Sequence, residues 1–344
     1  MVFIDTFREL VQVPGLSGYE DRVREDIKKR VEGLGRCFTD PIGNLVLELG
    51  GDGPSVLLAA HMDELGLVVT NIEDDGRVRF RKVGGIDDRV LPSQHVIIHS
   101  SRGDVGGVIG ITPPHIQLDK EPKVIPWSEL YIDVGANSSE EVRDMGVEVL
   151  DPVTFSKPWT VTGRGRVVAT RAVDDRFGCA LLVELALRIS SGGVRPKHRV
   201  YLAWTVQEEV GLRGALALAH RLSVEYMVSV DTVTCCNPVI TGALSLGKGP
   251  VIRALDNALI SSPKLARRIL KVARSHGIPL QVASAGGGTD AAAFQRVNVV
   301  ATALGVAVKY THSTVELVNL EDVKKLQELL EVVLEEGLKQ QTAV

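Results

Sequence analysis

Aromatic residues are scarce in this chain, at 4% of its 344 residues. Few rings are therefore available to stack on sugars, which disfavours a site built for a long polysaccharide. Long apolar runs are also lacking, because none approaches the roughly 20 residues that span a bilayer. We accordingly expect neither a polysaccharide nor a membrane as partner.

Cysteines are few and poorly spaced for binding a metal ion. The four are Cys37, Cys179, Cys235 and Cys236, and no two of them form a Cys-x-x-Cys pair. The adjacent Cys235 and Cys236 are not expected to form a structural disulfide. The amino terminus carries charged residues from position 5 on, unlike a secretory signal. These features indicate a protein of the reducing cytoplasm without a cysteine-based metal site.

A strong charge imbalance is also missing. The formal net charge is -4, with 24% charged and 44% hydrophobic residues, as in ordinary globular proteins. Nothing in this balance favours nucleic acid or an anionic membrane surface as a partner. The length of 344 residues is large for one hydrophobic core, so two domains are expected.

The two ends of the sequence alternate helical and strand patterns. Continuous apolar runs at 56–60, 199–205, 226–230 and 299–308 are typical of inner strands, and an alternating run at 44–49 predicts a half-buried one. Helices are predicted at 2–13, from 17 to 33 or 35, and at 177–189, 212–222, 263–277 and 319–334. This pattern predicts an α/β domain, with a mixed, mostly parallel sheet covered by helices, formed by residues 1–65 and 165–344.

Three of these helices begin with recognisable caps. Ser17 and Glu20 have the spacing of a capping box. Ser262 and Pro263 precede the helix that Gly277 ends, and a further polar cap at position 319 begins the last helix. We expect these side chains to bind the first free N–H groups of their helices.

Residues 66–164 have a different texture. Short alternating segments are joined by hairpin signals such as Asp75-Gly76, and prolines interrupt them repeatedly. One short helix is expected from about 138 to 146. We interpret this stretch as a smaller, β-rich domain inserted into the first domain.

The adjacent Glu208 and Glu209 follow the buried strand 199–205. Two carboxylates at this place are costly, because each raises the pKa of the other and burial penalises both charges. A nearby cation would offset that cost. The alternative is a surface pair at a helix start, where the helix dipole favours acidic groups.

Other possible metal ligands also stand at the ends of predicted elements. His61 and Asp63 follow the strand 56–60, and Asp231 and His312 follow later strands, while positions 174 and 175 hold two aspartates before a helix. The carboxyl ends of parallel strands converge, so one crevice could collect all these groups. Imidazole nitrogen and carboxylate oxygen are ligands of divalent metals. Taken singly, an aspartate pair before a helix is more often an N-cap, and a lone histidine is more often structural.

Together these segments resemble a known family. They read HMDELG at 61–66, TPPH at 112–115, IDVGA at 132–136, AVDDRFG at 172–178, QEEVG at 207–211, GGTD at 287–290 and YTHS at 310–313. Their order and spacing are similar to those of the dinuclear metallo-aminopeptidases of the tetrahedral (TET) and glutamyl-aminopeptidase type. Some members of that family carry endoglucanase or cellulase labels.

The resemblance implies a site with two divalent metal ions, zinc or cobalt. It implies that His61 and His312 are terminal ligands, one for each ion, and that Asp174 bridges the two. Glu209 and Asp231 would each complete the shell of one ion. Glu208 would be the general base, and Asp63 would orient His61, since histidine ligands usually have their second nitrogen held.

This set of residues is suited to peptide hydrolysis. Three carboxylates and a bridging hydroxide would neutralise two divalent ions, and a water shared by two ions becomes a nucleophile near neutral pH. Glu208 would pass its proton to the leaving amine. The family likeness implies peptide substrates with a free amino terminus, a barrel- or PDZ-like inserted domain, and a homo-oligomer of twelve subunits assembled through that domain.

Two segments depart from the family pattern. The stretch 291–295 lacks an expected histidine, and 305–309 replaces a proline-arginine version of the strand end. Both lie beside the expected pocket, so they bear on substrate preference more than on metal binding. Asp290 is expected to shape the substrate end of the pocket or to cap the following helix.

Three alternatives remain. A carboxypeptidase or amidohydrolase with the same metal ligands would need a basic residue for a substrate carboxylate. A non-enzymatic, metal-stabilised shell protein would tolerate the loss of the Glu208 charge. A glycosidase needs two carboxylates but no histidine or bridging aspartate, and is disfavoured.

Overall fold

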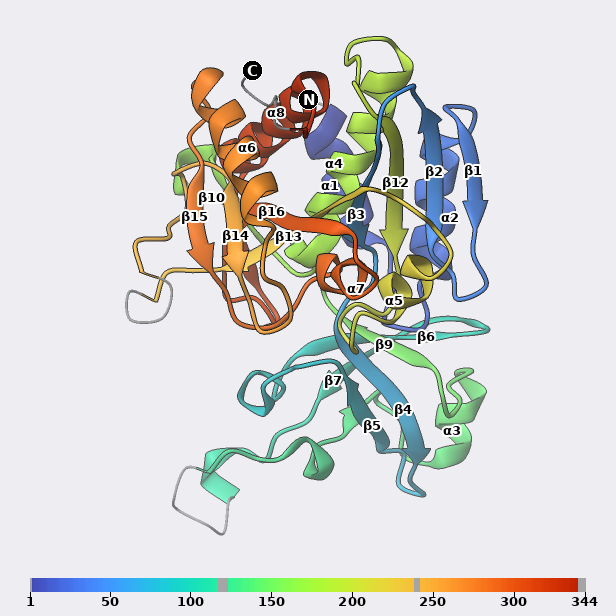
Figure 1. Ribbon diagram of the computed structural model, residues 1–344. Helices are drawn as coiled ribbons and strands as arrows, with labels where there is room; N and C mark the ends of the chain where they lie inside the picture. The colour runs from blue at the N-terminus through green and yellow to red at the C-terminus, as the bar shows by residue number, and fades with distance from the viewer. Residues whose placement is uncertain (1, 117–122, 238–241, 340–344) are drawn as a thin grey trace, which may run out of the picture.

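The computed structural model describes residues 2–116, 123–237 and 242–339. In this part of the chain, an eleven-stranded sheet forms the larger body and a closed six-stranded barrel the smaller one (Figure 1). The sheet contains β1 (Arg36–Thr39), β2 (Leu45–Gly50), β3 (Ser55–His61), β10 (Thr160–Thr162), β11 (Val167–Thr170), β12 (Arg199–Thr205), β13 (Tyr226–Thr234), β14 (Val251–Leu255), β15 (Gln281–Ser284), β16 (Val300–Lys309) and β17 (Glu316–Asn319).

The centre of the sheet is parallel, and antiparallel strands adjoin it, while β14 and β15 form one further parallel pair at its side. Strands β12, β3, β13 and β16 run parallel to one another, in that spatial order. Strands β2 and β17 join them antiparallel on either side. The predicted mixed α/β sheet is thereby confirmed, with its parallel pairing concentrated in the four central strands.

Helices cover both faces of the sheet. One face packs against α1 (Val2–Gln12), α2 (Asp21–Val31), α4 (Val173–Ser190), α6 (Pro263–Ser275) and α8 (Leu320–Glu336). The other face packs against the short α5 (Arg213–Ala219) and α7 (Ala291–Gln295). Along β3, Val56, Leu58 and Ala60 face the first layer, while Leu57 and Ala59 face the second. Both layers are apolar, which explains the unbroken hydrophobic runs of the central strands.

The barrel lies below the sheet in the view of Figure 1 and has its own hydrophobic core. It contains β4 (Gly66–Ile72), β5 (Val78–Val83), β6 (His95–Ser100), β7 (Gly103–Ile109), β8 (Ile132–Asp133) and β9 (Pro152–Phe155), and the short α3 (Ser139–Asp144) lies in the same segment. The predicted β-rich second body is therefore present. Strand β10, although within the segment 66–164, pairs with β11 of the large sheet.

Two of the three predicted helix caps are wrong. Glu20 precedes α2, but neither it nor Ser17 caps that helix, because both side chains bind elsewhere. Ser262 precedes α6 without a side-chain cap hydrogen bond. Asn319 does cap α8, by accepting a hydrogen bond from the N–H of Glu321 at 2.9 Å.

The expectation for the adjacent cysteines was also wrong. Cys235 and Cys236 form a disulfide, and Cys236 has a φ of 78°. Successive side chains of an extended strand point to opposite faces, and the left-handed backbone at Cys236 departs from that arrangement. Cys37 and Cys179 are free thiols. No helix within the described residues is long and apolar enough to cross a membrane.

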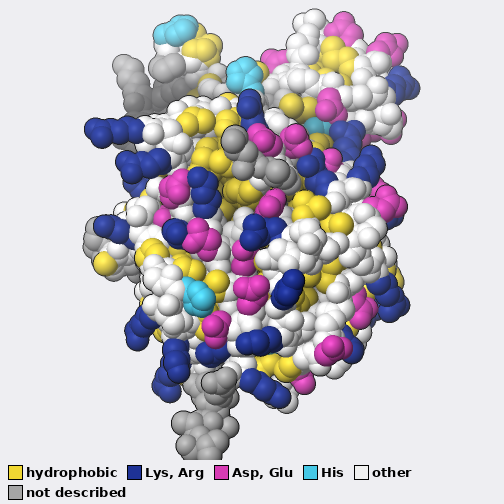
Figure 2. Space-filling view, turned by 90° about the horizontal axis from the view of Figure 1, so that it is seen from above, with side chains coloured by type: hydrophobic (Ala, Val, Ile, Leu, Met, Phe, Trp, Pro, Cys, Tyr) yellow, Lys and Arg dark blue, Asp and Glu magenta, His cyan; other side chains and the backbone are white. Residues whose placement is uncertain are grey.

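Charges are mixed on the face of the large body that lies away from the barrel. Figure 2 shows acidic and basic side chains interspersed there. This agrees with the small formal net charge of -4.

A buried ionic cluster ties the barrel to the sheet where the chain crosses between them. Glu64 lies just before β4, and Lys157 lies just after β9. Glu64 Oε1 accepts hydrogen bonds from Lys157 Nζ at 2.5 Å and from Arg176 Nη2 at 3.3 Å. These three side chains are at most 5% exposed. The two crossings are thus fastened to each other and to the start of α4.

We predict that Glu64→Ala lowers the free energy of unfolding by about 3–5 kcal/mol, because it leaves two buried cations without their counter-charge. Glu9→Ala, which removes a largely exposed partner of Arg30, serves as the control and should cost at most about 1 kcal/mol. Denaturant unfolding of the two variants measures both values. Equal losses in the two variants would contradict the structural role of Glu64.

Candidate metal centre

Two of the predicted ligands lie on neighbouring parallel strands. Ala59 of β3 pairs with Ser229 of β13. His61 and Asp231 come two residues later on the same strands and therefore point to the same face of the sheet. Both are nearly buried, at 3% and 6% exposure. The strand β13 continues to Thr234, so Asp231 lies within the strand and not at its end as predicted.

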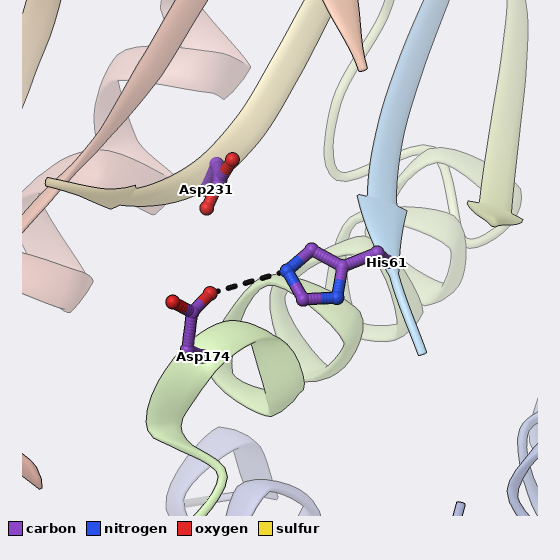
Figure 3. Close-up of side chains that lie close together, drawn as sticks. All are labelled: His61, Asp174 and Asp231. Carbon is purple, nitrogen blue, oxygen red and sulfur yellow. Dashed lines mark hydrogen bonds and ion pairs between the residues drawn. The ribbon is translucent and has the colours of Figure 1, made fainter. Parts of the chain in front are cut away.

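Asp174 completes this group from the first turn of α4. Its Oδ1 lies 3.1 Å from His61 Nε2, and its Oδ2 accepts a hydrogen bond from Thr232 Oγ1 at 2.9 Å. Figure 3 shows the side chains of His61, Asp174 and Asp231 pointing toward one another from three separate elements. One ligand atom from each of the three lies within 4.8 Å of the others. This spacing suits a single cation.

A second group of the same kind adjoins the first. Asp174, Glu209 and His312 also offer ligand atoms within 4.8 Å of one another. His312 Nε2 lies 3.4 Å from Glu209 Oε2. Asp174 belongs to both groups, so its carboxylate stands between two possible cation positions.

A backbone carbonyl oxygen lies beside Nδ1 of each of the two histidines, His61 and His312. His61 Nδ1 lies 3.2 Å from the carbonyl oxygen of Asp63, and His312 Nδ1 lies 3.2 Å from that of Gly85, in the loop after β5. A carbonyl oxygen can only accept, so each contact places a proton on Nδ1 and directs Nε2 toward the carboxylates. Histidine ligands of metal ions are usually held in this manner.

Asp63 connects His61 with the two glutamates. Its Oδ1 lies 3.4 Å from His61 Nδ1 and accepts the N–H of Glu208 at 2.9 Å. Its Oδ2 accepts the N–H of Glu209 at 3.1 Å and the hydroxyl of Ser17 at 2.6 Å. Asp63 is fully buried. The carboxylate therefore contacts the predicted histidine and fixes the backbone of both glutamates as well.

Asp174 and Asp175, considered above both as helix caps and as possible metal ligands, have different contacts. Asp175 Oδ1 accepts the N–H of Gly178 at 3.3 Å, as a helix cap does. The carboxylate of Asp174 makes no such contact and faces His61 and Thr232 instead. The N-cap interpretation therefore holds for Asp175 alone.

The electrostatics of the site favour bound cations. Burial and the neighbouring charges of Asp231 and Glu209 raise the pKa of Glu208 well above its ordinary value. Burial and the charge of Asp174 likewise raise the pKa of Glu209. Burial alone would raise the pKa of Asp174. The hydrogen bond with His61 and the charge of that histidine outweigh burial, so the pKa of Asp174 is lowered to about 2. The histidine nitrogens and carboxylates present thus fit divalent metal ions in charge, ligand type and spacing.

The site opens into a cavity of about 430 Å³. The residues that line this cavity include His61, Asp174, Glu208, Glu209, Asp231 and His312, and also residues 286–288, Asn257 and Arg296. The described residues make no hydrogen bond to the carboxylate of Glu208. It is therefore available to a molecule in the cavity.

Asp290 lies outside this lining. It is 2% exposed, and its Oδ2 accepts a hydrogen bond from Thr205 Oγ1 at 2.5 Å. It precedes α7 without a side-chain cap bond, so the predicted capping role is wrong. Its predicted role in substrate binding has no contact with the cavity to support it.

Three residues at the site were not predicted from the sequence. Thr232 binds Asp174, and Glu316 Oε2 accepts the N–H of Asp174 at 3.2 Å. Arg253 lies with its Nη2 3.9 Å from Asp231 Oδ2. A lone arginine in the otherwise apolar strand β14 is the sequence signal that could have revealed the last of these.

The comparisons with known proteins agree with this geometry. Residues 43–329 match the family described as M42 glutamyl aminopeptidase. The chain is 33% identical to a lysyl aminopeptidase of Pyrococcus furiosus, over 98% of both chains. It is 45% identical to the Pyrococcus horikoshii TET1 peptidase, with a TM-score of 0.91 over 96% of this chain and 99% of that one. A Thermotoga maritima structure named endoglucanase is 30% identical, with a TM-score of 0.78 over 96% and 97%.

Without bound cations, the free energy of unfolding should fall as the pH rises from about 4.5 to about 8. Burial and nearby negative charges raise the pKa of Asp290 to about 7 and that of Glu316 to about 8, and they also raise those of both glutamates at 208 and 209. The folded protein therefore holds protons that the unfolded chain releases, and each such group costs about 1.4 kcal/mol per pH unit in its range.

Denaturant unfolding of chelator-treated protein at several pH values tests this prediction. Zinc or cobalt should restore the stability lost at the upper end of the range, because the cations replace the protons. Glu208→Gln should flatten the pH dependence of the metal-free protein. A metal-free stability that rises with pH would contradict the assignment of an uncompensated acidic site.

Proposed function

The chain belongs to the M42 family of glutamyl aminopeptidases and is a metal-dependent aminopeptidase; from this premise we propose how its own residues carry out the reaction. Five residues would hold two divalent cations: His61 and Asp231 one of them, Glu209 and His312 the other, and Asp174 both. The two overlapping groups of ligand atoms around Asp174 support this assignment most directly. Zinc and cobalt are the metals we propose.

Two divalent ions at this place would supply a nucleophilic water at neutral pH and polarise the scissile carbonyl. The protein supplies the proton transfer. Glu208 lines the cavity beside the proposed ligands, and its carboxylate, to which the described residues make no hydrogen bond, could take a proton from water and give it to the leaving amine. Glu209, its neighbour, faces His312 instead. One carboxylate thus serves as ligand and the next as general base.

The substrate would be a peptide with a free amino terminus, cleaved after its first residue. A carboxypeptidase with the same ligands would need a cation for the substrate carboxylate, and Arg296 lines the cavity. Membership of an aminopeptidase family outweighs that single observation. The endoglucanase name of one structural neighbour is not carried over, because a site of histidines around a shared aspartate is not what glycoside hydrolysis requires.

We further propose that residues 1–65 and 165–344 form the catalytic domain and that the inserted domain, 66–164, mediates assembly. One structural neighbour is described as a dodecamer, and another as assembling into a tetrahedron or a larger octahedral shell. By this likeness the chain would form a twelve-subunit tetrahedral shell.

The two adjacent glutamates give a matched pair of test variants. Glu208→Gln should lower kcat about 10²- to 10⁴-fold while both metal ions stay bound, because it removes only the proton acceptor. Glu209→Gln should lose one of the two ions, because it removes a ligand. Glu25→Gln, on the exposed side of α2, is the control and should change neither property.

The measurement combines metal analysis with hydrolysis of aminoacyl-nitroanilides by chelated protein reloaded with zinc or cobalt. Amino-blocked substrates and peptides with an amidated carboxyl end separate the aminopeptidase from the carboxypeptidase. Failure of the wild-type protein to hydrolyse any free-amino substrate after reloading would refute the proposed function. Full activity of Glu208→Gln would instead refute the role of Glu208 as general base and leave the metal-dependent aminopeptidase in place.

The proposed assembly predicts a particle of about twelve times the subunit mass of 37.1 kDa. Light scattering behind size-exclusion chromatography measures this mass, and electron microscopy shows the shape. Repeating the measurement over a range of concentrations separates a stable shell from a transient association. A monomer or dimer at every concentration would contradict the proposed shell without affecting the proposed site.

A further inference from the structure

The segment that carries the two glutamates is held by side chains from three distant parts of the chain. Residues 206–209 lie between β12 and α5, outside helix and strand. Their four successive N–H groups each donate to a side-chain oxygen. Val206 N donates to Asn44 Oδ1 at 3.0 Å and Gln207 N to Glu20 Oε1 at 3.0 Å. The next two N–H groups donate to the carboxylate oxygens of Asp63.

The carbonyl groups of the same segment are also bound. The oxygens of Val206 and Gln207 accept the N–H groups of Gly214 and Arg213, at 3.0 and 3.1 Å. The oxygen of Glu208 accepts two N–H groups from residues 211 and 212. Backbone hydrogen bonds thus hold the carbonyl groups of residues 206–208, whereas the N–H groups of residues 206–209 are held by side chains.

The backbone of Gln207 is strained. Its φ is 54°, in the left-handed region that costs a residue with a side chain roughly 1–2 kcal/mol. Such a conformation persists only where the surroundings determine it fully. The hydrogen bond from Gln207 N to Glu20 is therefore placed where it can hold an otherwise unfavourable turn, directly before Glu208.

Glu20 and Asn44 are themselves fixed. Glu20 is 4% exposed, and its Oε1 also accepts the N–H of Gly18 at 2.8 Å. Asn44 is fully buried, and its Nδ2 donates to Asp40 Oδ2 at 2.7 Å and to the oxygen of Gly214 at 2.9 Å. Glu20 lies before the segment 43–329 that matches the family, so the match by itself says nothing about this residue.

We propose that Glu20 and Asn44 are positioning residues, which fix the backbone of residues 206 and 207 so that Glu208 faces the cavity while Glu209 faces His312. This inference rests on the proposed function. Neighbouring side chains on a free loop would not keep these two directions. A misplacement of about 1 Å at a reacting group can lower a rate about 10²-fold, so a small shift of this segment has a large effect.

The test compares substitutions at Glu20 that keep or remove the accepting oxygen. Glu20→Gln keeps an amide oxygen at the same reach, so its kcat should stay within about threefold of wild type. Glu20→Ala removes the acceptor, and Glu20→Asp shortens it by one methylene, so each should lower kcat about 10- to 100-fold with little change in KM. Asn44→Ala should behave like Glu20→Ala.

Asp322 provides a matched control far along the chain. Like Glu20, it is a buried carboxylate that accepts two backbone N–H groups, from Gly247 at 2.6 Å and Gly249 at 2.8 Å. Asp322→Ala should lower the thermal unfolding midpoint about as much as Glu20→Ala does, without the loss of kcat. An equal loss of kcat in both variants would show a general effect of destabilisation and overturn the proposal.

Binding of cobalt(II) gives a readout that does not depend on turnover. Glu20→Ala should lower the affinity for one of the two cobalt ions about 10- to 100-fold and change the visible absorption spectrum of the bound cobalt. Glu20→Gln should leave the affinity and the spectrum unchanged. If Glu20→Ala does not fold, the comparison of Glu20→Gln with Glu20→Asp decides. Normal activity of Glu20→Asp with impaired Glu20→Gln would show that charge and not reach matters, and would overturn the proposal.

The two proposals can fail separately. An inactive wild-type protein that binds two cobalt ions would refute the proposed function and leave the cobalt test of Glu20 valid. An active wild-type protein with normal cobalt binding and kcat in Glu20→Ala would refute the positioning role alone.

Discussion

Mutual repulsion of buried carboxylates is the constraint on which this structure depends. Asp174, Glu208, Glu209 and Asp231 line the same cavity, and Arg253 Nη2 lies 3.9 Å from Asp231 Oδ2. Burial penalises each charge, and each carboxylate penalises the next. A site of this kind is stable only with protons or cations present. The same property that destabilises the empty site therefore supplies its affinity for divalent metals.

The fold meets this constraint with two different kinds of support. Parallel pairing of β3 and β13 brings His61 and Asp231 side by side, and this register is set by the hydrophobic core on both faces of the sheet. The glutamates lie beyond the sheet, where pairing no longer fixes the backbone. Side chains such as Asp63 take over there and bind the N–H groups directly. Strand pairing thus places His61 and Asp231, whereas side-chain hydrogen bonds to an irregular segment place Glu208 and Glu209.

This division also explains how much could be predicted from the sequence. The apolar runs located the central strands, and that signal also picked out the candidate ligands that follow or end them, such as His61. Ser17 and Glu20 look like a capping box, yet both are drawn to the site, since Asp63 and Gln207 offer them buried partners. Local spacing cannot show a partner that lies dozens of residues away. The arginine of β14 is different, because its place in an otherwise apolar strand is a local signal that could have revealed it.

The neighbouring Asp174 and Asp175 look alike in the sequence but have different contacts in the structure, and the cause is local. Asp174 and Asp175 have non-helical backbone angles, although they lie in the first turn of α4. Their side chains therefore do not follow helical spacing, and one caps the helix while the other reaches His61. A pattern that treats both as N-cap candidates cannot distinguish them. Only the course of the backbone decides which aspartate stands between the two cation positions.

The barrel takes part in the site as well as adjoining it. The carbonyl oxygen of Gly85, in the loop after β5, lies 3.2 Å from Nδ1 of the half-exposed His312. A side chain at position 85 would approach that nitrogen to 3.2 Å, so the glycine allows the contact. The cluster around Glu64 fastens both chain crossings between barrel and sheet. Because His312 belongs to one candidate cation position, the placement of the barrel bears on the geometry of that position through Gly85.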